Sequence, residues 1–298
     1  MGGEVVIGRG LTLDNPVGAA SGTFGYGFEA ERMGNLAGLG AVFTKGTTVD
    51  PRPGNAPPRI AEVPGGMLNS IGLQNPGVEV VAGEYAPRWR GWAPKVIVNV
   101  AGATIEDYVR VCQRLDPVPE VAAVELNISC PNIAHGLDLG VDPRAAAACT
   151  RAVRGVTGKA VIVKLTPNVT DIAEIGRAVQ DGGADAVSAV NTYLGMKWSG
   201  ARGRPVLPGS GMAGLSGPAI KPLALAAVAR LVAALTIPVI GIGGIASAED
   251  AREFLGLGAR AVQIGTANFY RPGIAATCAA ELQAAPAPRN HGTGSPLP

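Results

Sequence analysis

Short apolar segments rich in β-branched residues recur along the chain and alternate with longer segments of helical periodicity. Strands of a parallel barrel are apolar along their whole length, because helices cover them outside and side chains pack within. A doubly wound sheet gives a similar alternation, so the strand count decides, and eight strands close a barrel. We therefore predict an α/β fold, a (β/α)8 TIM barrel. The candidate strands are 16–20, 41–44, 96–100, 122–126, 161–165, 186–190, 238–242 and 261–264.

Helix signals lie between the later candidate strands. Side chains of Ser, Thr and Asp accept hydrogen bonds from the free N–H groups of a first helical turn, so they mark helix starts. We expect Thr104, Asp142, Thr170 and Ser247 to be N-caps. The candidate helices are 105–115, 143–156, 171–181, 218–235 and 248–257.

The composition limits the class of protein. Of the 298 residues, 47% are hydrophobic and 16% are charged, which indicates a large buried core. We predict one domain over residues 1–284 and a disordered Pro/Gly-rich tail over 285–298. A net charge of +2 without a long basic run argues against nucleic-acid binding. No segment resembles a signal peptide or a membrane span, so we expect a cytoplasmic protein.

The cysteines and histidines restrict the chemistry further. The four cysteines form no C-x-x-C pair, so we expect reduced thiols. With only His135 and His291, neither a metal site nor a Ser-His-Asp hydrolase is supported. We expect Cys112, Cys149 and Cys278 to be core or helix-surface residues.

The segment "GSGMAG", residues 209–214, formally matches the dinucleotide-binding pattern. It follows Pro205 and Pro208 rather than a strand, and no acidic residue lies about twenty positions further on. We predict a mobile loop here, and no Rossmann-type NAD site.

Polar residues or glycine pairs follow every candidate strand. In a parallel barrel the carboxyl ends of all strands open onto one face, where active sites are assembled. Strands often end where the sequence becomes polar, and this alone can account for the asparagines. It accounts less well for two lysines that stand at the ends of apolar strands, which favours a functional role. The residues are Ser21, Lys45, Asn99, Asn127 with Cys130, Lys164, Asn191 with Thr192, Gly243 with Gly244, and Gly265 with Thr266. Glycine-rich ends of strands seven and eight often bind phosphate, so we expect a phosphate-bearing cofactor.

Nine motifs carry a resemblance to a known family: "NPVGAASGTFGYG", "FTKGTT", "MLNSIGLQNPG", "NISCPN", "VKLTPN", "NTYLGM", "GLSGPAIKPLAL", "IPVIGIGGI" and "QIGTANF". In this order they resemble the flavin-containing dihydroorotate dehydrogenases of pyrimidine synthesis. The segments "ASGTFGYG" and "GLSGPAIKPLAL" are similar to the class 1B catalytic subunit. The cysteine of "NISCPN" resembles class 1, since class 2 enzymes carry serine there.

The resemblance implies FMN at the C-terminal face of the strands and oxidation of (S)-dihydroorotate to orotate in UMP biosynthesis. The implied flavin contacts are Ser21, Lys45, Gly46, Asn99, Asn127, Lys164, Val190, Gly217, Gly243, Gly244, Gly265 and Thr266. The implied substrate contacts are Lys45, Asn69, Ser70, Ile71, Gly72, Leu73, Asn127, Asn191 and Thr192. Amides and a lysine suit an anionic ring with amide donors and acceptors.

The implied reaction removes a hydride from C6 of dihydroorotate to flavin N5 and a proton from C5. Cys130 is the candidate base, because a thiolate is a competent proton acceptor. Lys164 can stabilise the charge that develops on the reduced flavin. Class 1B resemblance further implies a homodimer within a heterotetramer, whose electron-transfer subunit carries FAD and a [2Fe-2S] cluster and reduces NAD⁺.

Three alternatives remain open. They are a class 1A enzyme that uses fumarate, a dihydropyrimidine dehydrogenase, and a non-catalytic phosphate-binding scaffold barrel. The chain also departs from typical relatives at "IAHGLDLG", where His135 either tunes Cys130 or is exposed, and in the loop 197–214. That loop begins "KWSGARGRP", and its closure over the site can differ.

Overall fold

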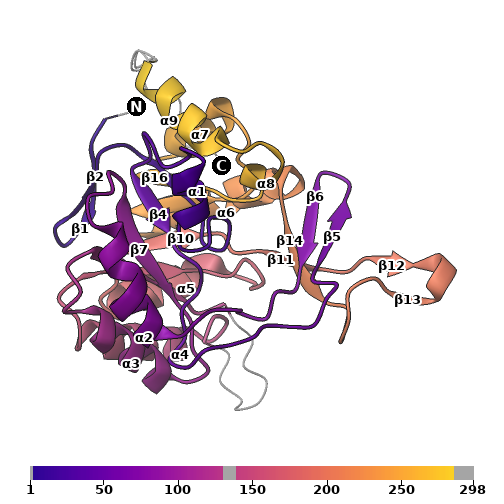
Figure 1. Cartoon of the computed structure of the whole chain (residues 1–298), viewed down its shortest axis with the longest axis horizontal. Helices are drawn as coiled ribbons and strands as arrows, with labels where there is room; N and C mark the ends of the chain where they lie inside the picture. Colours follow the sequence, from indigo (N-terminus) through magenta and orange to yellow (C-terminus); the bar gives the residue numbers. More distant parts are fainter. Residues whose placement is uncertain (1–2, 130–138, 285–298) are drawn as a thin grey trace.

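The computed structural model describes residues 3–129 and 139–284. Eight parallel strands form a closed barrel in which the order of strands follows the chain (Figure 1). All eight candidate strands belong to it, so the predicted barrel is confirmed. The strands are β3 (Val17–Ala19), β4 (Ala41–Phe43), β7 (Lys95–Val100), β8 (Val121–Asn127), β9 (Ala160–Lys164), β10 (Ala186–Ala189), β15 (Val239–Ile242) and β16 (Ala261–Ile264).

The predicted helices connect the later strands on the outside of the barrel (Figure 1). They are α3 (Ile105–Leu115), α4 (Pro143–Arg154), α5 (Ile172–Asp181), α6 (Lys221–Ala234) and α7 (Ala248–Gly256). The segment 218–235 divides into a 3-10 turn, η4 (Pro218–Ile220), and the helix α6. Four α-helices among the described residues were not predicted: α1 (Phe28–Arg32), α2 (Val78–Val80), α8 (Ala267–Tyr270) and α9 (Ile274–Ala284). The short helical elements η1 (Val81–Tyr85), η2 (Ala86–Trp89) and η3 (Gly200–Arg202) were not predicted either.

Three of the four predicted N-caps are confirmed. Thr104, Asp142 and Ser247 each accept a hydrogen bond from a first-turn N–H group. The prediction for Thr170 is wrong, because Asp171 accepts from the N–H of Ala173 instead, at 2.9 Å. A carboxylate one position nearer the helix serves as a cap equally well, so the helix begins one residue later.

The barrel interior is apolar at its amino-terminal end and polar further up. A hairpin of β1 (Val5–Gly8) and β2 (Leu11–Leu13) closes the lower end, where Ile7 packs in one cluster with Phe43 and Ile97. Above this cluster, four fully buried polar side chains meet between the strands: Asn99, Glu125, Ser188 and Gln263. We call these four residues the polar layer.

A second, antiparallel sheet lies beside the barrel mouth (Figure 1). Its order is β11 (Tyr193–Gly195), β14 (Ala213–Ser216), β6 (Gly66–Asn69) and β5 (Ile60–Val63). A hairpin of β12 (Trp198–Ser199) and β13 (Arg204–Pro205) projects away from it. The loop predicted over 209–214 is therefore wrong at its last two residues, which begin β14 because they pair with Asn69 and Gly195.

Cys112, Cys149 and Cys278 are buried free thiols, as predicted. Within 3–129 and 139–284, no cluster of side chains is suited to hold a metal ion. No helix in these two ranges is long and apolar enough to cross a bilayer.

Candidate active site

A cavity of about 530 Å³ lies at the carboxyl ends of the barrel strands, beside the small sheet. Cys130 and His135 lie outside the described residues. Every other residue that the resemblance implies lines this one cavity, although the individual roles stay predictions. They are Ser21, Lys45, Gly46, Asn69, Ser70, Ile71, Gly72, Leu73, Asn99, Asn127, Lys164, Val190, Asn191, Thr192, Gly217, Gly243, Gly244, Gly265 and Thr266.

Lys164 is the last residue of β9 and is 5% exposed. Its Nζ donates to Ser21 Oγ at 3.2 Å. No carboxylate among the described residues forms an ion pair with it. A surface lysine is therefore excluded, and the buried ammonium group is available to an anionic group in the cavity.

Lys45 follows β4 on the same face and is half-buried. Burial lowers the pKa of its ammonium group, and the positive charge of Arg59 lowers that pKa further. Both effects disfavour the charged form relative to a free lysine, and an anion bound nearby would favour that form again.

Asparagine side chains fix one another at the ends of β8 and β10. Asn191 Nδ2 donates to Asn127 Oδ1 at 3.0 Å, and Asn191 Oδ1 accepts from the N–H of Thr192 at 2.9 Å. The hydroxyl of the buried Tyr108 donates to the carbonyl oxygen of Asn127 at 2.7 Å. Asn127 therefore presents the NH₂ end of its amide to the cavity in a fixed orientation.

The small sheet supplies the segment 69–73. Asn69 Nδ2 donates to the carbonyl oxygen of Gly214 at 3.3 Å, which ties the segment to β14. Asn55 Nδ2 donates to the carbonyl oxygen and the hydroxyl of Ser70, both at 3.0 Å. Gly72 has a φ of +75°, and a Cβ there would lie 2.5 Å from Asn55 Oδ1. Only glycine allows this approach.

The glycine pair at the end of β15 lies against the start of α6, whereas Gly265 at the end of β16 lies near Ala20 and Thr23. Gly244 has a φ of +73°, and a Cβ there would meet the backbone of Lys221 at 2.8 Å. Thr266 Oγ1 donates to Ser216 Oγ at 2.8 Å, which joins the end of β16 to β14. Gly243, Gly244 and Thr266 line the cavity at this end, and backbone groups together with a hydroxyl are what a phosphate site uses.

Several cavity residues were not singled out from the sequence. Asn168 Nδ2 donates to Thr166 Oγ1 and to the carbonyl oxygen of Thr192, both at 3.0 Å. Asn168 and Thr166 belong to the motif "VKLTPN", whose polar end was a usable signal. Asn55 and Ser216 also line the cavity. Asn55 could not be identified from the sequence, because its hydrogen-bond partner Ser70 follows a different segment, the strand β6.

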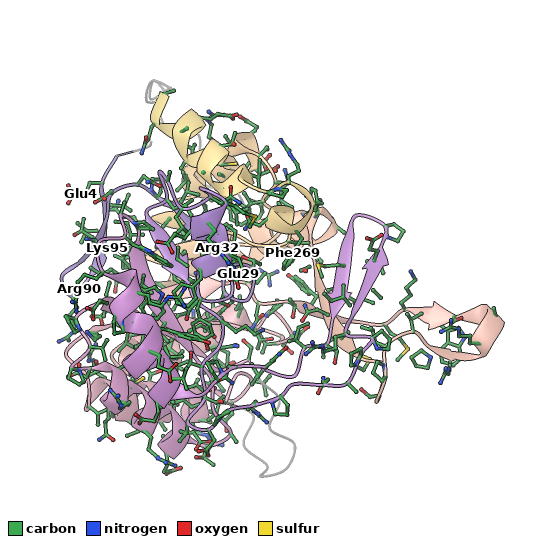
Figure 2. The ribbon with its side chains drawn as sticks, viewed as in Figure 1. Glu4, Glu29, Arg32, Arg90, Lys95 and Phe269 are labelled. Atoms are coloured by element: carbon green, nitrogen blue, oxygen red, sulfur yellow. The ribbon has the colours of Figure 1, made fainter. Side chains whose placement is uncertain are left out.

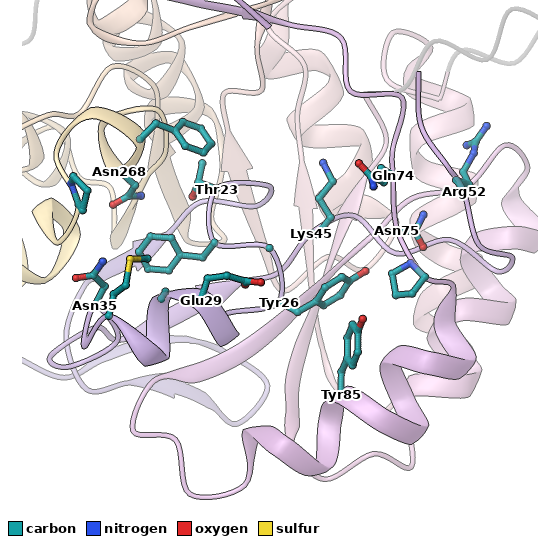
Figure 3. A pocket seen from close by; sticks show the side chains of 17 residues that line it. Thr23, Tyr26, Glu29, Asn35, Lys45, Arg52, Gln74, Asn75, Tyr85 and Asn268 are labelled. Atoms are coloured by element: carbon teal, nitrogen blue, oxygen red, sulfur yellow. The ribbon is translucent and has the colours of Figure 1, made fainter. Parts of the chain in front are cut away.

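A neighbouring cavity of about 880 Å³ has Lys45 in its wall (Figure 3). Tyr26, Glu29 and Asn268 contribute to its wall. It shares Thr23, Lys45 and Phe269 with the first cavity. Phe269 is 54% exposed and lies between the barrel and the small sheet (Figure 2). The two cavities therefore meet at an open, partly apolar edge.

Comparisons with known proteins agree with this geometry. The family model described as "Dihydroorotate dehydrogenase" matches residues 6–285. "Dihydroorotate dehydrogenase B (NAD(+)), catalytic subunit" of Geobacter sulfurreducens is 53% identical over 275 residues, which are 92% of this chain and 90% of that protein. The protein of the same description from Porphyromonas gingivalis is 50% identical over 273 residues, 91% of this chain and 89% of that protein. Its counterpart in Geobacillus kaustophilus is 48% identical over 276 residues, with 92% and 88% covered.

Proposed function

Since the chain belongs to the dihydroorotate dehydrogenase family, we propose that it oxidises (S)-dihydroorotate to orotate with FMN, and that its electrons reach NAD⁺ through a partner subunit. The reaction serves the synthesis of UMP. One observation supports this proposal most strongly. The residues implied for flavin and those implied for substrate come from segments far apart in the chain, yet they line a single cavity at the mouth of the barrel.

The chemistry of the cavity fits FMN. The carbonyl oxygen of the Asn99 side chain is buried and has no hydrogen-bond partner among the described residues. A ring with amide-like N–H and C=O groups suits this acceptor together with the amide of Asn127. Gly243, Gly244 and Thr266 would hold the phosphate, because they combine open backbone with a hydroxyl donor.

The residues of the chain have separate roles in the proposed reaction. When bound, FMN supplies the acceptor for the hydride of C6, at N5. Asn69, Asn127 and Asn191 bind and orient the substrate ring through its amide groups. Lys164 stabilises negative charge that develops on the flavin ring. Cys130 takes the proton from C5 as a thiolate.

The proposal of a partner subunit rests on the descriptions of the similar proteins. Their descriptions contain "catalytic subunit" and "NAD(+)", which favours the class 1B assignment over a class 1A enzyme that uses fumarate. In this proposal a second subunit carries FAD and a [2Fe-2S] cluster, and two copies of each chain form a heterotetramer. The compartment is the cytoplasm, in keeping with the buried free thiols.

Two measurements test the proposal. The purified protein should show flavin absorbance that dihydroorotate bleaches without oxygen, whereas dihydrouracil should not bleach it. A colourless protein that takes up no FMN would favour the scaffold barrel instead. NAD⁺ should be reduced only when the partner subunit is present, and turnover with fumarate alone would point to class 1A.

The role of Cys130 has its own test. Cys130→Ala should keep FMN but lower the single-turnover rate of flavin reduction by at least about 100-fold, since general base catalysis contributes about 10²–10⁴. Cys130→Ser should lose less. The rate should rise with pH toward the ordinary thiol pKa of about 8.5 in the native protein. Near-normal reduction by Cys130→Ala would eliminate this thiol as the base.

A further inference from the structure

Glu125 is a buried carboxylate at the centre of the polar layer, below the candidate active site. Its side chain is inaccessible to solvent, and three neutral groups donate to it. Oε2 accepts from Asn99 Nδ2 at 2.6 Å, whereas Oε1 accepts from Ser188 Oγ and Gln263 Nε2, both at 2.7 Å. Strands β7, β8, β10 and β16 therefore meet at this one group.

The carboxylate determines how the amide of Asn99 is turned. A carboxylate only accepts hydrogen bonds, so the NH₂ end of Asn99 must face Glu125 and the carbonyl end must face away. That carbonyl oxygen is buried without a partner among the described residues. A Cβ on Gly46 would lie 3.1 Å from it, and both Gly46 and Asn99 line the cavity. The unpartnered oxygen thus lies next to Gly46, in the wall of the site.

A buried acceptor without a donor is unfavourable unless a ligand supplies the donor. The oxidised flavin ring has a single N–H group, at N3. We infer that Glu125 is a positioning residue that holds the Asn99 carbonyl oxygen as a hydrogen-bond acceptor for the flavin ring. This inference rests on the proposed flavin site, but it does not depend on which substrate reduces the flavin.

Substitutions can reverse the polarity of this contact. In Glu125→Gln the orientation that keeps the two bonds from Ser188 and Gln263 turns the new NH₂ group toward Asn99. Asn99 then turns over to accept from it and presents NH₂ to the cavity. The exchange variant Glu125→Gln/Asn99→Asp restores an acceptor there, because the carboxylate introduced at position 99 accepts from the new amide with one oxygen and keeps the other free.

The test measures FMN binding to the apoprotein by quenching of flavin fluorescence. We expect Glu125→Gln and Asn99→Ala each to raise the Kd about tenfold, or about 1.4 kcal/mol. Glu125→Gln should add nothing in the Asn99→Ala background. The exchange variant should bind within about threefold of wild type. Ser188→Ala is the matched control: it removes a bond to Glu125 without touching Asn99, and it should leave the Kd within about twofold.

The inference is overturned if Glu125→Gln leaves the Kd for FMN unchanged. It is also overturned if Glu125→Gln raises that Kd equally in the wild-type and the Asn99→Ala backgrounds. If Glu125→Gln fails to fold, the exchange variant decides, since tenfold weaker binding by it contradicts the inference. In wild type loaded with ¹⁵N-labelled FMN, the N3 proton should resonate downfield of free FMN, and Asn99→Ala should abolish that shift. An unshifted proton in wild type overturns the inference. A protein that binds FMN but is not reduced by dihydroorotate refutes the proposed function alone.

Discussion

Replacing Gly244 by alanine places a methyl group where the chain of Lys221 already lies. The new Cβ would be 2.6 Å from Lys221 Cβ and 2.8 Å from its Cα and N. Lys221 cannot easily withdraw, because its Nζ is bound to Asp250 at 2.6 Å and to Glu253 at 3.0 Å. The left-handed φ of +73° costs about 1–2 kcal/mol for a residue with a Cβ, and overpacking costs about 1–3 kcal/mol. We expect a loss of about 2–5 kcal/mol in the free energy of unfolding.

Urea unfolding of the apoprotein, followed by circular dichroism, measures this loss without any contribution from bound flavin. Gly256→Ala is a matched control, because Gly256 ends α7 with nothing within 4 Å of its added Cβ. We expect it to be neutral or to stabilise the protein by up to about 1 kcal/mol. If Gly244→Ala unfolds within about 0.5 kcal/mol of wild type, the steric reasoning fails. FMN should also bind more weakly, since the backbone shifts at the phosphate end.

Other parts of the structure give three more predictions. Burial lowers the pKa of Lys45, so its charged form is disfavoured in the folded state. Lys45→Met should therefore stabilise the apoprotein at pH 7. Urea unfolding should show that this gain in the free energy of unfolding shrinks as pH rises toward the unfolded pKa of about 10.4. Burial raises the pKa of Cys149 to about 12 and that of Cys278 to about 11. Iodoacetamide at pH 8 should therefore alkylate both at least about 100-fold more slowly than a free thiol, as peptide mass spectrometry can check, and fast labelling of the native protein would contradict this. Thr104→Ala breaks a capping box and should cost about 1 kcal/mol in thermal unfolding, with Thr104→Ser close to wild type; an equal loss in both would exclude the cap as the cause.

The barrel could be predicted because its strands are buried on both sides. Runs such as "VIVKL" around Lys164 are apolar until the strand ends, and the first polar residue then marks the mouth of the barrel. Lys45 and Asn127 were expected on the same face, although a buried polar residue, Thr44 or Glu125, precedes each of them. Periodicity also set the bounds of the five predicted helices to within three residues, but it missed α9 and the short helices.

The small sheet and the polar layer could not be predicted. Residues 60–69 contain glycine and form short strands, whose pairing with β14 depends on residues far along the chain. Glu125 lies within the apolar run "AAVELN", where a single acidic residue shows no period. Its importance becomes visible only when Asn99 and Gln263, from two other strands, are placed against it.

The pairing of β6 with β14 has a consequence for how the molecule is made. Asn69 and Gly214, which join the two strands, are separated by 145 positions. At about 5–20 residues per second of translation, roughly 7–30 s pass between the synthesis of one partner and that of the other. During that interval the β5–β6 hairpin has an open edge, and open edges invite wrong pairing. Pulse-labelled nascent chains halted before residue 213 should therefore aggregate or bind chaperones more than chains halted after residue 216.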